Sequence, residues 1–362
     1  MLSKEKGFVL QGLDHFSKQE IKEFWEGWEP KNDKPKILGV GLSCTFRCNL
    51  KCVYCYAGDK EPLPDELTLE EQKSIITQAK KLGAETVIIC GDAEPLMDKN
   101  LLGIVEHGYR NEITCVVVSN GISLGDDKLA MNIHGMKSKE VASTLYNLGS
   151  SLVIKMESIT SELYNQIVGV KDAYRKFMQA VNNIMEVGFG NGIERESDIL
   201  TRVCFSSVVM VNNIDELPAM KEFANQRNAQ YICKLPSLVG RALENLEMMF
   251  PVSRYEEIRR HLSKFTAKRE TLMVDTPRCM AWHYGPVIDI RGEIRECYTS
   301  PCNHQNRIGN IREKSLEELL KRRNTIYDIT INDFCPVKTR INRELEAKGL
   351  HRIWDVESKD RL

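Results

Sequence analysis

The sequence predicts an α/β protein in which parallel strands alternate with helices. From Ile37 to about Leu235, short apolar runs bounded by turn residues alternate with longer segments of helical pattern. Helix boundary signals fit this division, with a capping box beginning at Thr68 and glycines at Gly149 and Gly188 in C-cap positions. The apolar content of 42% over 362 residues is enough for a large core.

Each element in this region is expected from its own local pattern. The strands are predicted over residues 37–42, 85–90, 114–118, 152–156, 202–209 and 230–235. The helices are predicted over residues 68–82, 98–107, 139–148, 173–187 and 215–226. This order is typical of consecutive βα units that share one parallel sheet.

Composition excludes several classes of partner. The net charge of −1 gives no overall field that would attract nucleic acid or an anionic membrane. We find no apolar run long enough for a membrane span and no signal peptide. Twelve cysteines without an export signal favour a reducing cytoplasm, where metal or redox roles are commoner than disulfides.

Three closely spaced cysteines follow the first predicted strand. Cys48, Cys52 and Cys55 have CxxxCxxC spacing, so a short loop can turn three thiolates toward one point. Thiolates select zinc or iron–sulfur clusters, and both closed zinc sites and cubane clusters normally take four protein ligands. Three ligands therefore suit a cluster with one open corner. Cys44 lies upstream, where the strand should still be extended, and we discount it as a fourth ligand.

This segment resembles the signature of the radical S-adenosylmethionine (SAM) enzymes, and Tyr54 matches the aromatic residue before the third cysteine. The resemblance implies a partial (β/α)6 TIM-like barrel over residues 37–240, with its chemistry at the carboxyl ends of the strands. It also implies a [4Fe–4S] cluster whose open iron binds SAM, reductive cleavage to methionine and a 5′-deoxyadenosyl radical, and a reductant such as flavodoxin or ferredoxin. A zinc knuckle is the alternative interpretation.

The resemblance assigns SAM contacts to residues that follow the next strands. Residues 91–95, Gly-Asp-Ala-Glu-Pro, resemble the family's Gly-Gly-Glu-Pro loop, although both glycines of the pair are replaced, by Asp92 and Ala93. The resemblance implies that the Ala93 backbone and the Glu94 carboxylate hold the amino group of SAM. Ser119 and Asn120 resemble a Thr-Asn pair that faces the ligand in relatives.

Two further polar residues end the fourth predicted strand. Lys155 and Glu157 occupy positions where relatives place polar groups against the ribose and carboxylate of SAM, and a surface salt bridge is an equally good interpretation. Val168 stands where many relatives have an arginine, so no arginine is assigned to the SAM carboxylate.

A second cysteine set follows the predicted barrel. Cys279 and Cys297 flank a predicted hairpin, residues 286–295, that turns at Arg291-Gly292. The set resembles the auxiliary-cluster element of the SPASM and twitch extensions, and with Cys302 and Cys335 it offers four ligands for a second [4Fe–4S] cluster. Structural zinc is the alternative.

The chain outside the predicted barrel divides into four further parts. We expect a twitch-like domain over 275–340, a helical lead-in over 1–36, a helical connector over 241–274 and a charged tail over 341–362.

The implied function is that of an enzyme that abstracts a hydrogen atom from its substrate. Cys204 and Cys233, on the last two predicted strands, are candidate hydrogen-atom donors if they face the barrel interior. Because residues 1–36 are too short for a peptide-recognition domain, we expect a small polar substrate, sugar-like or cyclitol-like, in natural-product or cofactor biosynthesis. Oxidation, epimerisation and dehydration all fit. The alternatives are a maturase of ribosomal peptides and a non-catalytic zinc-binding scaffold.

Overall fold

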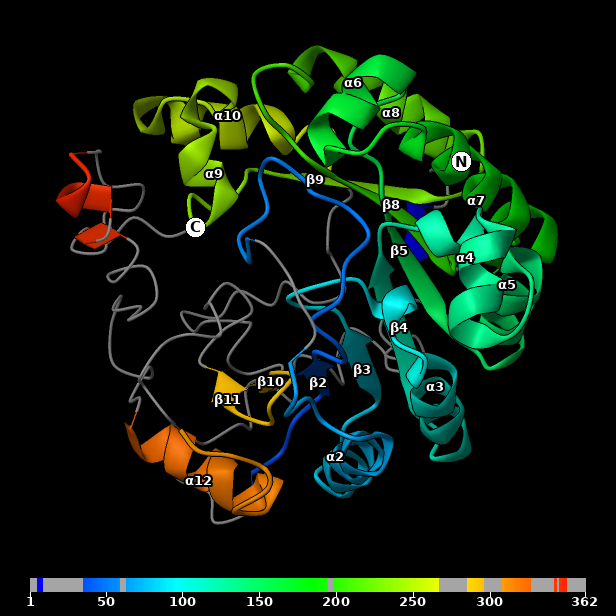
Figure 1. Ribbon diagram of the computed structural model, residues 1–362, viewed down its shortest axis with the longest axis vertical. Coiled ribbons are helices and arrows are strands. Elements are labelled where there is room, and N and C mark those ends of the chain that lie inside the picture. Colours follow the sequence, from blue (N-terminus) through cyan, green and yellow to red (C-terminus); the bar gives the residue numbers. More distant parts are fainter. Residues whose placement is uncertain are drawn as a thin grey trace.

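The computed structural model describes residues 5–8, 35–58, 63–194, 198–266, 285–295, 308–326, 342–343 and 345–349. Its main feature is a curved, open sheet with the order β11-β10-β2-β3-β4-β5-β8-β9, parallel except for the antiparallel pair β10–β11 (Figure 1). The bounds are β2 Gly39–Leu42, β3 Thr86–Ile89, β4 Thr114–Ser119, β5 Ser151–Lys155, β8 Val203–Val208, β9 Gln230–Lys234, β10 Val287–Ile288 and β11 Ile294–Arg295.

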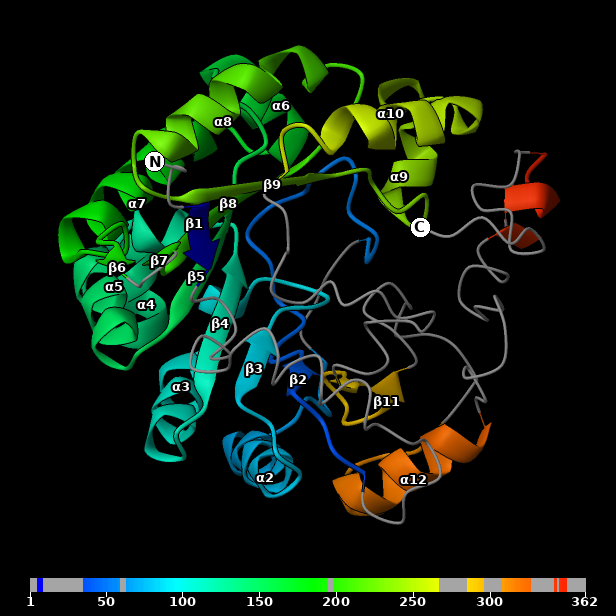
Figure 2. The same cartoon turned by 180° about the vertical axis from the view of Figure 1, so that it is seen from behind.

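The helices cover the outer, convex side of this sheet, as both views of the chain show (Figures 1 and 2). None of the described helices is both long and apolar enough to cross a bilayer. Their bounds are α2 Leu69–Lys81, α3 Leu101–Arg110, α4 Asp127–His134, α5 Ser138–Asn147, α6 Ser161–Val168, α7 Ala173–Val187, α8 Leu217–Asn225, α9 Arg241–Glu244, α10 Tyr255–Leu262 and α12 Leu316–Ile326.

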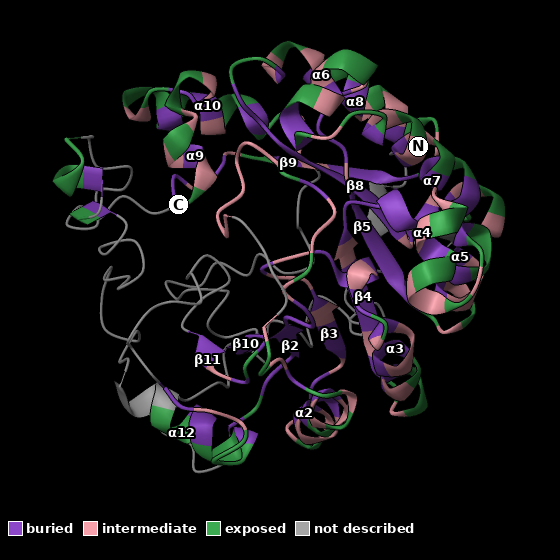
Figure 3. Ribbon diagram, viewed as in Figure 1, coloured by how far each residue is buried: buried purple, intermediate pink, exposed green. Residues whose placement is uncertain are grey.

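The strands of the sheet are largely buried (Figure 3). Their side chains divide between two faces. Val117, Ile154 and Phe205 belong to the main core, which packs against the helices. Their strand neighbours Val116, Val153 and Cys204 form a second, smaller cluster. Because successive side chains of a strand point to opposite faces, this second cluster lies on the concave side, inside the partial barrel.

The predicted α/β barrel class is confirmed, and each predicted strand and helix of the region appears within a few residues of its expected bounds. Helix α2 begins as predicted, because the Thr68 side chain and the Glu71 carboxylate form the reciprocal capping box. The connector carries α9 and α10. Helices α4 and α6 were not predicted, since each has only 8 residues and lies where loops were expected.

A separate small sheet was also not predicted. Strand β1, Glu5–Phe8, pairs in parallel with β7, Asp198–Thr201, which pairs with β6, Ile193–Glu194. The first described residues of the expected helical lead-in are therefore a strand. The rest of that lead-in, residues 9–34, and the charged tail from 350 onward lie outside the described residues.

The hairpin β10–β11 turns at Arg291-Gly292, as predicted, and extends the main sheet. The amides of Gly41 and Ser43 donate to the carbonyls of Pro286 and Ile288, each at 2.9 Å. Strand β2 is thus paired with β3 on one side and with β10 on the other. The hairpin and the barrel share one sheet, although the expected domain boundary near residue 275 falls outside the described residues.

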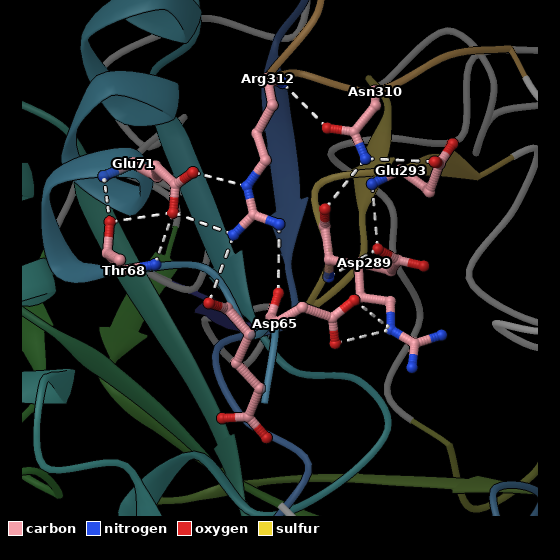
Figure 4. A network of polar contacts seen from close by, with 9 residues as sticks. Asp65, Thr68, Glu71, Asp289, Glu293, Asn310 and Arg312 are labelled. Atoms are coloured by element: carbon pink, nitrogen blue, oxygen red, sulfur yellow. Dashed lines mark hydrogen bonds and ion pairs between the residues drawn. The ribbon is translucent and has the colours of Figure 1, made fainter. Parts of the chain in front are cut away.

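A polar network on the surface also holds the C-terminal segment against the barrel (Figure 4). Arg312 Nε lies 2.5 Å from Glu71 Oε1, and its Nη2 lies 3.1 Å from Glu71 Oε2. This paired arginine lowers the pKa of Glu71 to about 2. Arg291 contacts Asp65 at 3.1 Å, from the turn of the hairpin. The network joins the segment after β11 to the start of α2.

Replacement of Gly285 tests the extension of the sheet. An added Cβ at Gly285 would lie 1.7 Å from the Gly39 carbonyl oxygen, so Gly285→Ala must push the hairpin away from β2. We expect the amides of Gly41 and Ser43 to exchange with deuterium at least about tenfold faster, since they lose their acceptors. Gly135→Ala is the control, because it has positive φ but nothing within 4 Å of its Cβ. Unchanged protection in Gly285→Ala would contradict the pairing.

Asp98 is a carboxyl group buried in the core beside Cys44. It is 7% exposed, and its Oδ1 accepts the Asn100 amide at 2.8 Å. Burial raises its pKa from 3.8 to about 6, so the folded protein holds this proton more tightly than the unfolded chain does. The stability gained from protonation is therefore present below about pH 4 and is lost as the pH rises through about 6.

We expect Asp98→Asn to remove this part of the pH dependence. At about pH 8 the variant should be more stable than the parent protein by up to about 3 kcal/mol, since it buries no charge, and at about pH 5 the difference should fall to roughly half of that. Urea unfolding of both proteins at both pH values measures this difference in unfolding free energy. Parallel stability curves for the two proteins would show that Asp98 does not titrate with the raised pKa.

Candidate functional site

The three cysteines of the signature lie on one loop, residues 43–58, which we call the cysteine loop. It leaves the carboxyl end of β2 and crosses the mouth of the partial barrel (Figure 1). The end of α6 holds it, because the amides of Lys51 and Val53 donate to the carbonyls of Val168 and Ile167 at 2.9 and 3.0 Å. Gly169 permits this approach, since a Cβ there would lie 2.7 Å from the Lys51 carbonyl oxygen.

The loop is held a second time by the start of α9. The Arg241 amide donates to the Cys55 carbonyl at 2.9 Å, and Asn245 Nδ2 donates to the Val53 carbonyl at 3.2 Å. Gly240 has φ +58, and a Cβ there would lie 2.4 Å from the Tyr56 carbonyl oxygen. The Gly-Arg-Ala run at 240–242 therefore fixes the backbone around the third cysteine.

The thiols of Cys48, Cys52 and Cys55 are all partly exposed and close enough to influence one another. Loss of contact with water raises the pKa of Cys52, and the nearby charges of Glu157, Cys55 and Cys48 raise it further. Three adjacent thiolates repel one another unless a cation lies between them, so this donor set fits an iron–sulfur cluster.

Among the described residues, no three His, Cys, Asp or Glu side chains converge as ligands of one metal ion. In a cubane cluster each thiolate binds a different iron atom, so the sulfurs do not need to converge so closely. Cys44 is buried in the main core, and the Gln72 side chain donates to its carbonyl at 3.0 Å, so its thiol lies apart from this set.

Glu94 lies at the end of β3, at the base of the cysteine loop. It is 2% exposed, and its carboxylate accepts the Leu96 amide at 2.9 Å, the Ser119 hydroxyl at 2.7 Å and the Asn120 amide at 2.7 Å. Its own amide donates to the Arg47 carbonyl at 2.9 Å. These contacts fix one carboxylate between the ends of β3 and β4. The neighbouring Ala93 is partly exposed on the same loop.

Asn120 connects the end of β4 to the cysteine loop. Its Nδ2 donates to Asn49 Oδ1 at 2.8 Å, and its Oδ1 accepts the Ile122 amide at 2.9 Å. Asn49 directly follows Cys48, so this bond orients the loop at its first thiol. No sequence pattern indicated Asn49, because its role depends on contact with a residue 71 positions away.

Lys155, Glu157 and Tyr54 form a polar group at the end of β5, in which Glu157 is buried and the other two are partly exposed. Tyr54 Oη donates to Glu157 Oε1, the Val208 amide donates to Oε2 at 2.8 Å, and Lys155 Nζ lies 3.3 Å from Oε1. Lys155 Nζ also lies 5.7 Å from the centre of the Tyr54 ring. Lys155 and Glu157 thus form an ion pair, as one interpretation of the sequence predicted. The pair is not at the surface, however, because the Glu157 side chain is only 1% exposed.

Asp92, which stands in place of a family glycine, forms a buried ion pair that the sequence did not indicate. Both of its oxygens accept from the Arg295 guanidinium, with Nη1 3.0 Å from Oδ1. Asp92 is 0% exposed and Arg295 is 6% exposed. Tyr56 Oη also donates to Asp92 Oδ1 at 3.3 Å.

The two proposed hydrogen donors lie on opposite faces of the sheet. Cys233 belongs to the helix-facing core, with its sulfur 3.3 Å from Thr266 Oγ1, so it does not face the barrel interior as that assignment required. Cys204 faces the interior, but it is 0% exposed and lies at the second position of β8, away from the carboxyl end.

Cys90 is better placed at the mouth than either of these. It follows β3 on the same face as the interior-facing Ile88, and it is partly exposed. Burial and the charge of Asp92 raise its pKa to about 12, while Lys234 and Arg295 act in the opposite direction. Charged groups from β9 and β11 therefore lie around this thiol. The four proposed auxiliary ligands, Cys279, Cys297, Cys302 and Cys335, lie outside the described residues.

Comparison with known proteins agrees with this architecture. The chain is similar over 279 residues to an AdoMet-dependent heme synthase from Oleidesulfovibrio alaskensis, at 23% identity, covering 75% of this chain and 64% of that protein. It is 25% identical over 205 residues to an Fe-coproporphyrin III synthase from Methanosarcina barkeri, covering 56% of this chain and 44% of that protein. A GTP 3′,8-cyclase from Helicobacter pylori is 27% identical over 201 residues, covering 53% of each chain. The chain thus spans about half the length of most of these relatives.

Solved structures show the same fold at low sequence identity. Streptococcus suis SuiB bound to its precursor peptide SuiA superposes with a TM-score of 0.61 at 14% identity, covering 79% of this chain and 65% of that one. The structure of anSMEcpe with bound AdoMet and Cp18Cys peptide gives a TM-score of 0.57 at 15% identity, covering 89% and 91%.

A family model also matches directly, over residues 42–224, which include the cysteine loop, the Glu94 loop and the ends of β4, β5 and β8. This stretch covers just over half of the chain, and the predicted family is confirmed: the protein belongs to the Radical SAM superfamily.

Proposed function

We propose that this protein cleaves SAM reductively and uses the radical to abstract a hydrogen atom from a substrate held in the mouth of the barrel. The observation that carries the proposal is the convergence of the cysteine loop with Glu94, Asn120 and Glu157 at the carboxyl ends of three neighbouring strands. Cys48, Cys52 and Cys55 would hold the [4Fe–4S] cluster, which supplies the electron for the cleavage when it is bound.

In this proposal the chain's own residues orient SAM. The Glu94 carboxylate, held by donors from two loops, receives the ammonium group, and the Ala93 backbone contributes a carbonyl. Ser119 and Asn120 hold that carboxylate in position. Lys155 and Glu157 present the polar end of β5 to the ribose and carboxylate, and Tyr54 fixes Glu157 beneath the cysteine loop.

A small polar substrate remains our first candidate. The interior face near the carboxyl ends carries Lys155 and Cys90, with Lys234 close to that thiol, so polar and charged side chains lie at the mouth. Such a lining suits a sugar-like or cyclitol-like substrate that undergoes oxidation, epimerisation or dehydration. Natural-product biosynthesis in a reducing cytoplasm fits this chemistry and the need for free thiols.

A peptide substrate is the second candidate, and a specific observation favours it. Both solved structures with similar folds, SuiB and anSMEcpe, are described with a bound peptide. In either case we propose a second [4Fe–4S] cluster on Cys279, Cys297, Cys302 and Cys335, in a twitch-like or SPASM-like domain, and electron supply from a flavodoxin or ferredoxin. That cluster would accept the electron of the product radical or adjust the site.

Anaerobic reconstitution tests the function. We expect the protein to bind several iron atoms and to change the EPR spectrum of its reduced cluster when SAM is added, because SAM ligates the open iron. With candidate substrates it should form 5′-deoxyadenosine, carrying deuterium from the attacked position. Cys52→Ala should abolish this formation, whereas Cys115→Ala, a matched change of a buried cysteine in the helix-facing core, should retain it.

Two outcomes would contradict this proposal in different ways. A colourless protein with stoichiometric zinc would support the scaffold alternative. If the protein contains iron but its EPR spectrum does not change when SAM is added, the proposed SAM cleavage is excluded. If 5′-deoxyadenosine increases only with peptides, the second substrate candidate replaces the first.

Glu94→Gln tests the orientation of SAM. The Glu94 carboxylate accepts hydrogen bonds from three donors, and in the variant the NH2 group of glutamine must face at least one of them. Because that hydrogen bond is lost, we expect the unfolding free energy to fall by about 1–3 kcal/mol. We also expect a higher KM for SAM, because the ammonium loses its carboxylate partner. Asp126→Asn is the control, since Asp126 also accepts a backbone amide, but at the N-cap of α4, where its partners are Leu129 and Lys176. An unchanged KM for SAM in Glu94→Gln would refute the role of Glu94.

A further inference from the structure

The buried pair of Asp92 and Arg295 joins the proposed SAM-binding loop to the C-terminal hairpin. Asp92 lies two residues before Glu94, and Arg295 is the last residue of β11. The guanidinium contacts both oxygens of the carboxylate, which is the geometry in which an arginine constrains orientation as well as distance. A residue that replaces glycine in the resemblance is therefore compensated by a cation from 203 positions further along the chain.

Asp92 also contacts the cysteine loop. Tyr56 Oη donates to Asp92 Oδ1 at 3.3 Å, and Tyr56 directly follows the third cysteine of the signature. The buried Asp92 carboxylate thus links its own loop to two other segments, the cysteine loop and the hairpin. Asp289, on the same hairpin, lies 3.8 Å from Arg295 Nε and adds a second acidic group beside the guanidinium.

The backbone around Asp92 leaves little room for adjustment. Gly91 has φ +122, and a Cβ there would lie 2.0 Å from Ser43 Oγ and 3.3 Å from Ser43 Cα. The loop is therefore packed directly on the start of the cysteine loop. Because the charges of Asp92 and Arg295 are both buried, removal of one takes from the other its opposite charge at hydrogen-bond distance, and the segments that carry them must separate or rearrange.

We infer that Asp92 and Arg295 are a positioning pair through which the C-terminal hairpin holds the SAM-binding loop in its binding conformation. This inference rests on the proposed role of the Glu94 loop in binding SAM. The pair acts through Glu94 and the cysteine loop and does not itself contact the reacting atoms. Cys297 follows Arg295 by two residues, so the same pair would couple the proposed auxiliary ligands to SAM binding.

Titration of the reconstituted, reduced protein with SAM tests the pair, with the EPR change as the readout. We expect Arg295→Gln and Asp92→Asn each to raise the apparent Kd for SAM by about tenfold or more. The rate of 5′-deoxyadenosine formation at saturating SAM should stay within about twofold of the parent rate, because the pair positions the loop without taking part in the cleavage. The double variant should recover part of the affinity, since it removes both charges of the pair together while Asp289 keeps the amides of Arg291 and Glu293 as donors.

Arg312→Gln is the matched control. It also removes an arginine that joins the C-terminal segment to the barrel, but its partners at the surface are Glu71 and the carbonyls of Asp65 and Glu66, at the start of α2. It should lower thermal stability without changing the Kd for SAM. If Arg295→Gln does not fold, Arg295→Lys keeps the charge, loses the two-pronged contact and should still raise the Kd.

The outcomes separate the inference from the proposed function. If the parent protein shows no EPR response to SAM, the proposed function fails. If the parent responds and Arg295→Gln binds SAM as tightly as Arg312→Gln does, then the pair is only a structural ion pair and the inference is overturned. A loss of affinity that Arg312→Gln shares equally would also overturn it, because docking of the segment would then suffice to explain the effect.

Discussion

The short strand β2 is the element on which the site depends. It pairs in parallel with β3 on one side and with β10 on the other, and it runs directly into the cysteine loop. In a parallel sheet the carboxyl ends of neighbouring strands meet at one edge. The thiols after β2 and Glu94 after β3 must therefore leave the sheet side by side, and the hairpin that carries Arg295 is paired beside them.

The second constraint is electrostatic. Glu94, Glu157 and Asp92 are all buried at this edge, and each is compensated by donors from a different part of the chain. Burial of uncompensated charge is costly, so these contacts hold the loops in one arrangement. The polar framework of the site is thereby assembled from the protein's own groups, and a cofactor bound there would meet side chains that are already oriented.

Sequence patterns predicted the strands, most helices and the residues at the strand ends, because these depend on local periodicity and on position along the chain. They could not predict which face Cys204 and Cys233 occupy, since a shift of one residue reverses the face of a strand. They also missed Asn49 and the Asp92–Arg295 pair, because both depend on contacts between residues 71 and 203 positions apart. The replaced family glycine was visible, but its compensating partner was not.

The pairing of β10 with β2 also bears on how the chain folds. The amides of Gly41 and Ser43 donate to the carbonyls of Pro286 and Ile288, which lie far along the chain. One edge of β2 therefore stays uncovered until most of the polypeptide has been synthesised. Contacts between such distant segments form slowly, and an uncovered strand edge invites pairing with other chains. Late closure of this edge leaves the base of the cysteine loop accessible in the nascent protein, so the loop that carries the three thiols is exposed to premature association until the hairpin has been made.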